Sequence, residues 1–376
     1  MKIFRNGSYL DYAVTVSKYK QQLKNEIVII ESVDHLDHIA LYIAWMEVGG
    51  RILVRAPMLP SKQKEELDKQ LAEQPANDCV FLHTSGTTGS PKLVSFDQNA
   101  FKQIIKKSEQ HLDWNSNTSW LNFIPPFTSG FWHIVLPAIV KHDCKIVLSN
   151  RQTLKDDFQT DVNATIFIPG LIDQFRIAEL KLPLDKFDIV ASGASQLLPR
   201  HAKYIFDNGC NVFNHIYGST EIGSPVLGHR TTELDETSCY LELDKNCKIR
   251  NDELIYNGVA TADLFEIKQY VGNGLIQFKG RSNDVVKVNG YQCSLLLIEN
   301  YLEEMGYGDC LAVPKNKAGS DYIELMHTKG NPDKDAIKEM LVPYLPPCNI
   351  PLKYSKIDSV PRNSLNKKIR NALETN

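Results

Sequence analysis

Residues 79–92 read CVFLHTSGTTGSPK, a short apolar run followed by a loop of hydroxyl residues, glycines and a lysine. The run CVFLH, at 79–83, has the length and composition of a buried strand. The loop TSGTTGSPK, at 84–92, suits polyphosphate, because glycines let backbone N–H groups approach phosphate oxygens while hydroxyls and lysine add donors and positive charge. It is not a Walker A loop, since no GK[ST] follows at the required glycine spacing. A strand that ends in such a loop predicts a ligand site of an α/β protein.

Apolar runs on both sides of this loop alternate with helical patterns. A helical stretch, IALYIAWMEVG at 39–49, lies between the β-rich runs EIVIIES (26–32) and RILVRA (51–56), and a charged helix is expected over 62–72. Further β-rich runs are CKIVL (144–148), ATIFIP (164–169), FDIVAS (187–192) and VFNHIYG (212–218). This βαβ rhythm predicts an α/β fold with a parallel sheet.

The pattern changes in the last third of the chain. Short strands separated by turn signals begin at Asp252, and a helix is expected over 295–305, ahead of a basic tail. We therefore expect a large N-terminal α/β domain with mixed sheets, residues 1–281, and a small C-terminal α+β domain, residues 282–376.

The composition argues against several classes of function. The 42 Lys+Arg residues and 45 Asp+Glu residues give a net charge of -3, and no long basic run offers a nucleic-acid surface. The N-terminal MKIFRNGSYLDY lacks the apolar core of a signal peptide. The longest apolar stretch, 131–140, is about half of the ~20 residues that a membrane span requires. We expect a cytoplasmic enzyme without a membrane span or a nucleic-acid partner.

Neither cysteine nor histidine spacing predicts a metal site. The eight cysteines include no CxxC pair, so free thiols are expected. His35 and His38 have a spacing that some metal sites use, but they open a helical stretch and have no third ligand nearby. Polar residues at the start of a helix are the better interpretation.

Several segments together resemble one superfamily. The loop TSGTTGSPK resembles the phosphate-binding signature of the adenylate-forming enzymes, which comprise acyl-CoA synthetases, peptide-synthetase adenylation domains and luciferases. Five further segments of this chain resemble later signature segments of the superfamily and occur in the expected order. They are ASGAS (191–195), IYGSTEIG (216–223), TAD (261–263), GRSND (280–284) and PRNSLNKKIR (361–370). The chain departs from the family at Leu93, Ala262 and Asn366, each of which stands where glycine is usual.

The resemblance implies a nucleotide site. Phosphate binding falls to Thr84, Ser85, Gly86, Thr87, Thr88, Gly89 and Lys92. The adenine and acyl sites are lined by Gly193, Ala194, Ser195, Tyr217, Gly218 and Ser219, with Tyr217 stacked on adenine. Asp263 and Arg281 reach the ribose. Taken alone, small residues at a strand end serve packing equally well, and an aspartate after a strand is more often a turn residue.

The resemblance also implies the catalytic groups. Thr220 contacts phosphate, Glu221 helps to hold Mg²⁺, and Lys367 is the catalytic lysine. Carboxylate and hydroxyl oxygens are hard ligands of the kind that Mg²⁺ prefers beside ATP phosphates. Asn283 stands at the hinge about which the small domain moves. By composition alone, a solvated helix face is the better interpretation of the basic cluster around Lys367, which includes Lys368 and Arg370.

The segment IPPFTSGFWHIVLP, at 124–137, resembles the acyl gate of the family. Its candidate substrate residues are Phe127, Gly130, Trp132 and His133. Aromatic walls suit an apolar or aryl acid, although such a cluster also serves as core. Amino-acid-activating relatives have aspartate where this chain has Thr128, so an α-amino acid is disfavoured.

The implied activity is ATP-dependent conversion of a carboxylic acid into its acyl-AMP and transfer to coenzyme A, with Mg²⁺ as metal. Fatty and aryl acids are the expected substrates, and an o-succinylbenzoate-CoA ligase-like enzyme is one candidate. Two alternatives stay open, namely loading of a carrier-protein phosphopantetheine and an inactive nucleotide-binding scaffold. The region before the phosphate loop is shorter than in typical members, which implies either a shallower acyl pocket or a homodimer that completes it.

Overall fold

The computed structural model describes residues 1–84, 91–150, 152–269, 274–288, 291–317, 320–333, 335, 337, 352–362 and 368–370. Contacts divide the chain into two compact units. Unit 1 comprises Met1–Lys248, Tyr256–Thr261 and Ile267–Gln277. Unit 2 comprises Ile249–Ile255, Ala262–Glu266 and Phe278–Asn376. The main segment of unit 2 thus begins close to the expected boundary at 281, and two short segments from earlier in the chain join it.

A four-stranded sheet in unit 1 carries the strand that leads into the phosphate-type loop. Its strands, in order, are β3 (Val28–Ile30), β4 (Arg51–Val54), β5 (Cys79–Thr84) and β6 (Lys92–Phe96). The first three strands are parallel and β6 is antiparallel to β5. The helices α2 (His35–Val48) and α3 (Ser61–Ala72) follow β3 and β4. The βαβ rhythm of the sequence is therefore confirmed in this sheet.

The helix α2 is apolar on nearly every side because it is buried. Tyr42 and Trp45 are almost fully enclosed in the core of unit 1. Asp34 caps the helix, since its Oδ1 accepts a hydrogen bond from the Leu36 N–H at 2.8 Å. The histidines of this segment are thus residues of a helix start, as expected. Among the described residues, no group of three His, Cys, Asp or Glu side chains lies close enough to hold a metal ion.

An eight-stranded mixed sheet forms the other large layer of unit 1. Its order is β12-β11-β10-β9-β7-β8-β1-β2. The bounds are β1 (Lys2–Arg5), β2 (Ser8–Leu10), β7 (Ser119–Asn122), β8 (Lys145–Leu148), β9 (Ala164–Phe167), β10 (Ile189–Ser192), β11 (Phe213–Ser219) and β12 (Gly223–Thr231). All strands are parallel except the two edge strands β2 and β12.

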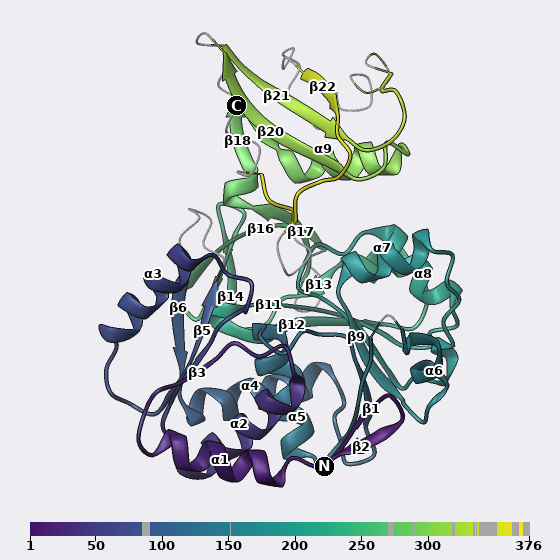
Figure 1. Cartoon of the computed structure of the whole chain (residues 1–376). Coiled ribbons are helices and arrows are strands. Elements are labelled where there is room, and N and C mark those ends of the chain that lie inside the picture. The colour runs from purple at the N-terminus through teal and green to yellow at the C-terminus, as the bar shows by residue number, and fades with distance from the viewer. Residues whose placement is uncertain are drawn as a thin grey trace. The chain divides into compact units, whose positions relative to one another are not determined.

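Both faces of this sheet are covered by helices, as the apolar runs of its strands require (Figure 1). Trp120 and Ile146 point into the core that they share with α2, whereas their neighbours Leu121 and Val147 point to a second core on the opposite face. The first core also takes side chains from α4 (Gln98–His111) and α5 (Leu136–Lys141). The second core is closed by α6 (Leu154–Gln159), α7 (Pro169–Ile177) and α8 (Pro199–Asp207).

The N-terminal strands β1 and β2 were not expected from the sequence. They form a hairpin through Asn6 and Gly7, whose φ angles are 52° and 74°. The signal was available, because Asn-Gly is the preferred pair of a two-residue hairpin turn with positive φ at both positions. The hairpin adds β1 to the eight-stranded sheet beside β8.

A five-stranded sheet contains residues of both units. Its order is β13-β17-β16-β15-β14. The bounds are β13 (Leu241–Glu242), β14 (Cys247–Arg250), β15 (Glu253–Tyr256), β16 (Val259–Gln269) and β17 (Leu275–Arg281). The strands β15, β16 and β17 follow Asp252, where the sequence pattern changes, whereas β13 and β14 lie before it and were not expected.

In the rest of the described part of unit 2, the helix α9 packs against strands. This part holds the hairpin β18 (Val285–Val288) and β19 (Tyr291–Ser294), the helix α9 (Leu295–Glu304) and a sheet of β20 (Cys310–Lys317), β21 (Ser320–His327) and β22 (Leu352–Lys356). Ile298 and Leu302 of α9 pack in a core with Ile323 and Leu325 of β21. Within the described part of the chain, no helix has the length and apolarity needed to cross a membrane.

Candidate active site

Three of the predicted site segments leave the same edge of the eight-stranded sheet. ASGAS begins inside β10 and continues beyond it, the aromatic-Gly-x-Thr-Glu segment ends β11, and the gate segment follows β7. The strands β11 and β10 are adjacent and parallel, and only β9 separates β10 from β7. Because the carboxyl ends of parallel strands meet at one edge, the sheet gathers these segments there.

A hydrogen bond joins two of these segments directly. Thr220 opens a short 3₁₀ turn, η3 (Thr220–Ile222), and its Oγ1 donates to Ser129 Oγ at 2.9 Å. Ser129 lies in the gate segment and was not among the predicted site residues. The available signal was a hydroxyl residue directly before Gly130 in a segment that already resembled the gate. Ser129 therefore belongs with Thr220 in the candidate site.

The phosphate-type loop connects two paired strands beside this point. Thr84 ends β5 and is paired with Lys92, which begins β6, and β5 lies next to η3. Lys92 is exposed at the first position of its strand. The remaining predicted phosphate ligands, Ser85, Gly86, Thr87, Thr88 and Gly89, lie outside the described residues, so their roles stay predictions.

The small residues of ASGAS differ in what they do. Gly193 is buried, and a Cβ on it would lie 2.5 Å from the Ile216 carbonyl oxygen of β11, so close packing of neighbouring strand ends requires this glycine. Ala194 and Ser195 are exposed. Ala194 has a φ of 72°, in the left-handed region that side chains other than glycine rarely adopt. The backbone here makes a sharp turn directly after β10.

The segment from Tyr217 to Glu221 combines an irregular strand end with exposed polar groups. The pairing of β11 with β12 shifts register between Tyr217 and Ser219, around Gly218, and such bulges often redirect side chains next to active sites. Tyr217 is half-buried and Glu221 is exposed. The Ser219 hydroxyl is buried and has no hydrogen-bond partner among the described residues.

The four predicted substrate residues occupy two environments. Phe127 and Gly130 are half-buried, and Phe127 packs against the core. Trp132 and His133 are fully buried on η1 (Phe131–Val135), a π-helical turn that continues into α5. The Trp132 indole N–H donates to His38 Nδ1 at 3.1 Å. Of the two interpretations of this aromatic run, the burial of Trp132 and His133 favours core packing for these two side chains.

His133 is an unusual core residue. Its ring lies 4.6 Å from that of Phe96, and neither ring nitrogen has a hydrogen-bond partner in the described structure. Burial lowers the pKa of His133 to about 3, so the imidazole is neutral at physiological pH. The sequence did not predict the π-helical turn that holds it, and such turns occur frequently at functional sites.

In unit 2, the two predicted ribose ligands contact each other. Arg281 Nε donates to Asp263 Oδ1 at 2.7 Å, and the carboxylate is almost fully buried. Ala262, which replaces the glycine usual in the family, has a φ of 60°, and its N–H donates to Glu253 Oε1 at 2.8 Å. The left-handed angle gives a physical reason for glycine at this position in relatives. Asn283 lies in the 3₁₀ turn η5 (Ser282–Asp284), at the predicted hinge.

In the described part of the basic tail, Lys368 and Arg370 do not lie on a solvated helix face. Lys368 and Arg370 are largely buried and form ion pairs with acidic residues of unit 2, including Glu299. Burial alone would lower the pKa of Lys368, but Glu299 and Glu303 outweigh this effect and raise it, so the ammonium stays charged. Lys367 itself lies outside the described residues, and its catalytic role stays a prediction.

A family match over more than half of the chain identifies its family. Residues 18–253 match the family model described as AMP-binding enzyme. The chain belongs to the AMP-binding enzyme family. The matched range includes the phosphate-type loop, ASGAS and the aromatic-Gly-x-Thr-Glu segment.

Relatives of this AMP-binding enzyme include long and short proteins. Bacitracin synthase 3 of Bacillus licheniformis is 22% identical and matches 81% of this chain, which spans only 6% of that synthase. A 2-succinylbenzoate–CoA ligase of Staphylococcus epidermidis is 23% identical over 78% of this chain and 69% of its own length. The structure of o-succinylbenzoate coenzyme A synthetase from Bacillus subtilis in complex with AMP aligns over 100% of this chain and 95% of its own, with a TM-score of 0.80 and 15% identity. That likeness establishes the fold.

The polar groups of this AMP-binding enzyme fit a nucleotide polyphosphate. Ser129, Ser219 and Thr220 present hydroxyls at the edge of the eight-stranded sheet, and Thr84 adds one at the end of β5. The buried Ser219 hydroxyl has no partner among the described residues and is the kind of group that a ligand satisfies. Lys92 adds positive charge and Glu221 an exposed carboxylate. Mg²⁺ bound beside phosphates needs only one or two protein carboxylates. The exposed Glu221 would meet that need, and its role in holding Mg²⁺ stays a prediction.

Proposed function

We propose that this protein is an AMP-forming acid–thiol ligase, which activates a carboxylic acid with ATP and transfers the acyl group to coenzyme A. The observation that carries the proposal is that three segments meet at η3. The end of β5, which leads into the phosphate-type loop, lies next to η3, and the hydrogen bond from Thr220 to Ser129 joins η3 to the gate segment. This arrangement supports the proposal because the hydroxyls that are proposed to bind phosphate then lie beside the segment proposed to admit the acid.

The proposed first half-reaction is attack of a carboxylate oxygen on the α-phosphorus of ATP. A new O–P bond forms, the bond from the α-phosphorus to the bridging oxygen breaks, and pyrophosphate leaves. The acid is already ionised at neutral pH, so the reaction needs neutralisation of phosphate charge more than a general base. Lys367 and Lys92 are proposed to supply positive charge, and Thr220 to donate a hydrogen bond. Mg²⁺, held by Glu221, would neutralise further phosphate charge.

The proposed second half-reaction consumes the acyl-adenylate. The sulfur of coenzyme A attacks the acyl carbon, a C–S bond forms, the C–O bond to AMP breaks, and the thiol proton passes to solvent. This step needs no neutralisation of a polyphosphate. We therefore propose that Lys367 acts in the first half-reaction only. Rotation of the small domain about Asn283 is proposed to move Lys367 away before the second half-reaction.

The acid is proposed to be an aryl or fatty acid rather than an α-amino acid. Thr128 has no charge and cannot form an ion pair with a substrate ammonium group, as a carboxylate would. The half-buried Phe127 offers an apolar surface at the gate. Relatives named 2-succinylbenzoate–CoA ligase support an o-succinylbenzoate-like acid and coenzyme A as acceptor. The peptide-synthesising relatives favour the alternative acceptor, a carrier-protein phosphopantetheine. A cytoplasmic location and a homodimer stay predictions from the sequence.

The experiment that tests the proposal is exchange of labelled pyrophosphate into ATP with a panel of acids, comprising o-succinylbenzoate, benzoates, fatty acids and amino acids. We expect exchange with an aryl or fatty acid and none with amino acids. Adding coenzyme A or a phosphopantetheinylated carrier protein then identifies the acceptor. Binding of ATP without exchange for any acid would support the inactive scaffold and overturn the proposed activity.

Replacement of the proposed catalytic lysine provides the sharper test. We expect Lys367→Ala to slow exchange by roughly 10² to 10³, because one preorganised positive donor to the transition state is lost, while ATP still binds. The matched control is Lys356→Ala, which removes an exposed lysine of unit 2 and should leave exchange unchanged. Full exchange activity in Lys367→Ala would remove Lys367 from the mechanism.

A further inference from the structure

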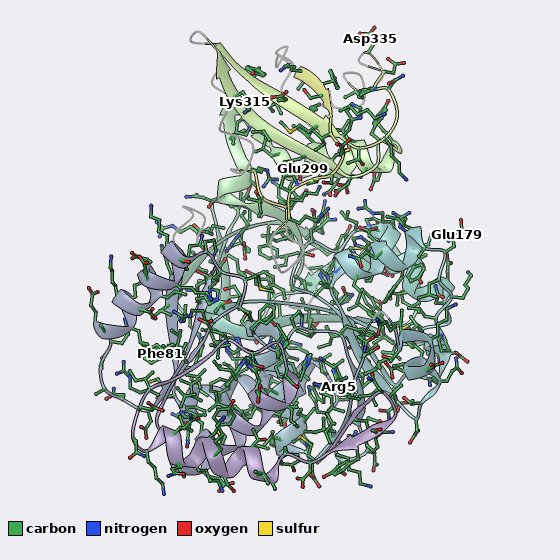
Figure 2. All side chains as sticks on the ribbon, in the orientation of Figure 1. Arg5, Phe81, Glu179, Glu299, Lys315 and Asp335 are labelled. Carbon is green, nitrogen blue, oxygen red and sulfur yellow. The ribbon has the colours of Figure 1, made fainter. Side chains whose placement is uncertain are left out.

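Glu299 is a buried carboxylate that three separate donors satisfy. It lies on α9, is 0% exposed and is labelled in Figure 2. Its Oε1 accepts from Arg370 Nη2 at 2.9 Å and from the Ala312 N–H of β20 at 2.9 Å, and its Oε2 accepts from Lys368 Nζ at 3.2 Å. Glu299 thus joins the helix, the sheet and the C-terminal segment of unit 2.

Arg370 extends these contacts to the predicted hinge. Its Nη1 donates to Asp284 Oδ1 at 2.6 Å, and its Nε donates to the Ala312 carbonyl oxygen at 3.3 Å. Asp284 is the last residue of η5, the turn that contains Asn283. A planar guanidinium with donors in a fixed geometry holds its acceptors in defined directions. The segment that follows Lys367 is therefore tied to the turn at which the domain is proposed to move.

The chain on both sides of residues 363–367 is also held together. Lys368 Nζ donates to Glu303 Oε1 and to the Cys310 carbonyl oxygen, both at 2.6 Å. Arg362 pairs with Lys368 in an antiparallel bridge, and its Nη2 donates to Asp309 Oδ1 at 2.6 Å. Lys368 is thus fixed to α9 and to the start of β20, and Arg362 is fixed to Asp309, the residue directly before β20.

Stability alone does not account for so many buried charges. Replacing a buried ion pair by well-packed apolar side chains is often neutral or stabilising, because both charges lose their hydration when they are buried. What a directional cluster supplies is a defined geometry. Misplacement of a reacting group by about 1 Å can cost on the order of 10² in rate.

We propose that Glu299, Arg370 and Asp284 form a positioning cluster that fixes residues 368–370, which directly follow the proposed catalytic Lys367, to the hinge turn. These residues act through Lys367 and touch neither the acid nor the nucleotide. The inference rests on the proposed function. The cluster is expected to support the adenylation half-reaction, which is proposed to use Lys367, and to have no effect on the rate of the thioester-forming half-reaction.

The test separates the two half-reactions in Arg370→Gln. Single-turnover formation of acyl-adenylate is measured with ATP and the panel acid that the wild-type protein activates, and thioester formation is measured with the adenylate of that acid and coenzyme A. We expect adenylation to fall by about 10² while thioester formation is unchanged. Asp284→Asn should show the same split. The matched control is Lys353→Gln, which breaks an ion pair with Glu324 away from the cluster and should alter neither rate.

Further variants keep the inference falsifiable if Arg370→Gln does not fold. Arg370→Lys keeps the charge but cannot reach both carboxylates with a fixed fork, so it should slow adenylation less than the glutamine variant and again spare thioester formation. Equal losses in both half-reactions, or full adenylation in a folded variant, would overturn the positioning role. A wild-type protein that forms no acyl-adenylate would instead overturn the proposed function itself.

Discussion

Two alanines of the candidate site have backbone angles that usually require glycine. Ala194 and Ala262 have φ angles of 72° and 60°. A left-handed angle costs a residue with a Cβ roughly 1 to 2 kcal/mol, and glycine loses about 0.5 to 1 kcal/mol more backbone entropy on folding. Because Ala194 is exposed and loses no packing, we expect Ala194→Gly to raise the free energy of unfolding by up to about 1 kcal/mol. Urea unfolding measures this difference.

The matched control lies three residues earlier in the same segment. Ala191 is fully buried within β10, so Ala191→Gly removes a packed methyl group and adds chain entropy to the unfolded state. A loss of about 1 to 2 kcal/mol is expected. Similar losses in both variants would show that the turn at Ala194 does not strain the folded chain.

The helix α2 depends on a side chain that has two partners. Asp34 caps its N-terminus through the Leu36 N–H and also accepts from Arg5 Nη1 of β1 at 3.0 Å. Asp34→Ala removes the cap and the ion pair, and we expect it to lower the free energy of unfolding by about 1 to 2 kcal/mol. Thermal unfolding followed by circular dichroism, calibrated with urea titrations, measures the loss.

Two variants separate these contributions. Asp34→Asn keeps a capping oxygen but loses the charge, and Arg5→Gln removes the other member of the half-exposed pair. Each is expected to cost less than about 1 kcal/mol. If Asp34→Ala costs no more than Arg5→Gln, the cap contributes nothing measurable to the helix.

At the scale of unit 1, burial strongly lowers the pKa of four described histidines, which must gain protons on acid unfolding. Burial is the main cause that lowers the pKa of His35, His38 and His215 to about 4 and that of His133 to about 3, from an ordinary value of 6.5. Below pH 6.5 the unfolded chain therefore binds protons that the folded chain does not. Stability is fully present above pH 6.5 and is lost as the pH falls towards 4. Each histidine should cost about 2 kcal/mol by pH 5.

His133→Leu tests this dependence in a single position. All four tryptophans lie in unit 1, so their fluorescence during urea unfolding reports on the unit that contains these histidines. At pH 7.5 the variant should be at least as stable as the wild type, because His133 has no hydrogen bond to lose in the described structure. At pH 5 it should have lost about 2 kcal/mol less. Equal acid losses in both proteins would contradict this account.

Local sequence patterns were sufficient for much of the fold. The runs around 26–32, 51–56 and 79–83 are strands β3, β4 and β5, because apolar β-branched runs between helical patterns have few other stable arrangements. The helix expected over 295–305 is α9. The N-terminal hairpin was missed although Asn6 and Gly7 carried its turn signal.

The sequence by itself determined the family, the order of the site segments and the alternation of strands and helices, since these depend on residue types and spacings along the chain. Only the tertiary structure placed Ser129 against Thr220, buried His133 with no hydrogen-bond partner among the residues it describes, and paired Glu299 with Arg370. Each of these contacts joins residues that are distant in sequence or depends on how a side chain is packed. No local pattern encodes such contacts, because burial and hydrogen bonding are set by the elements that fold against a residue.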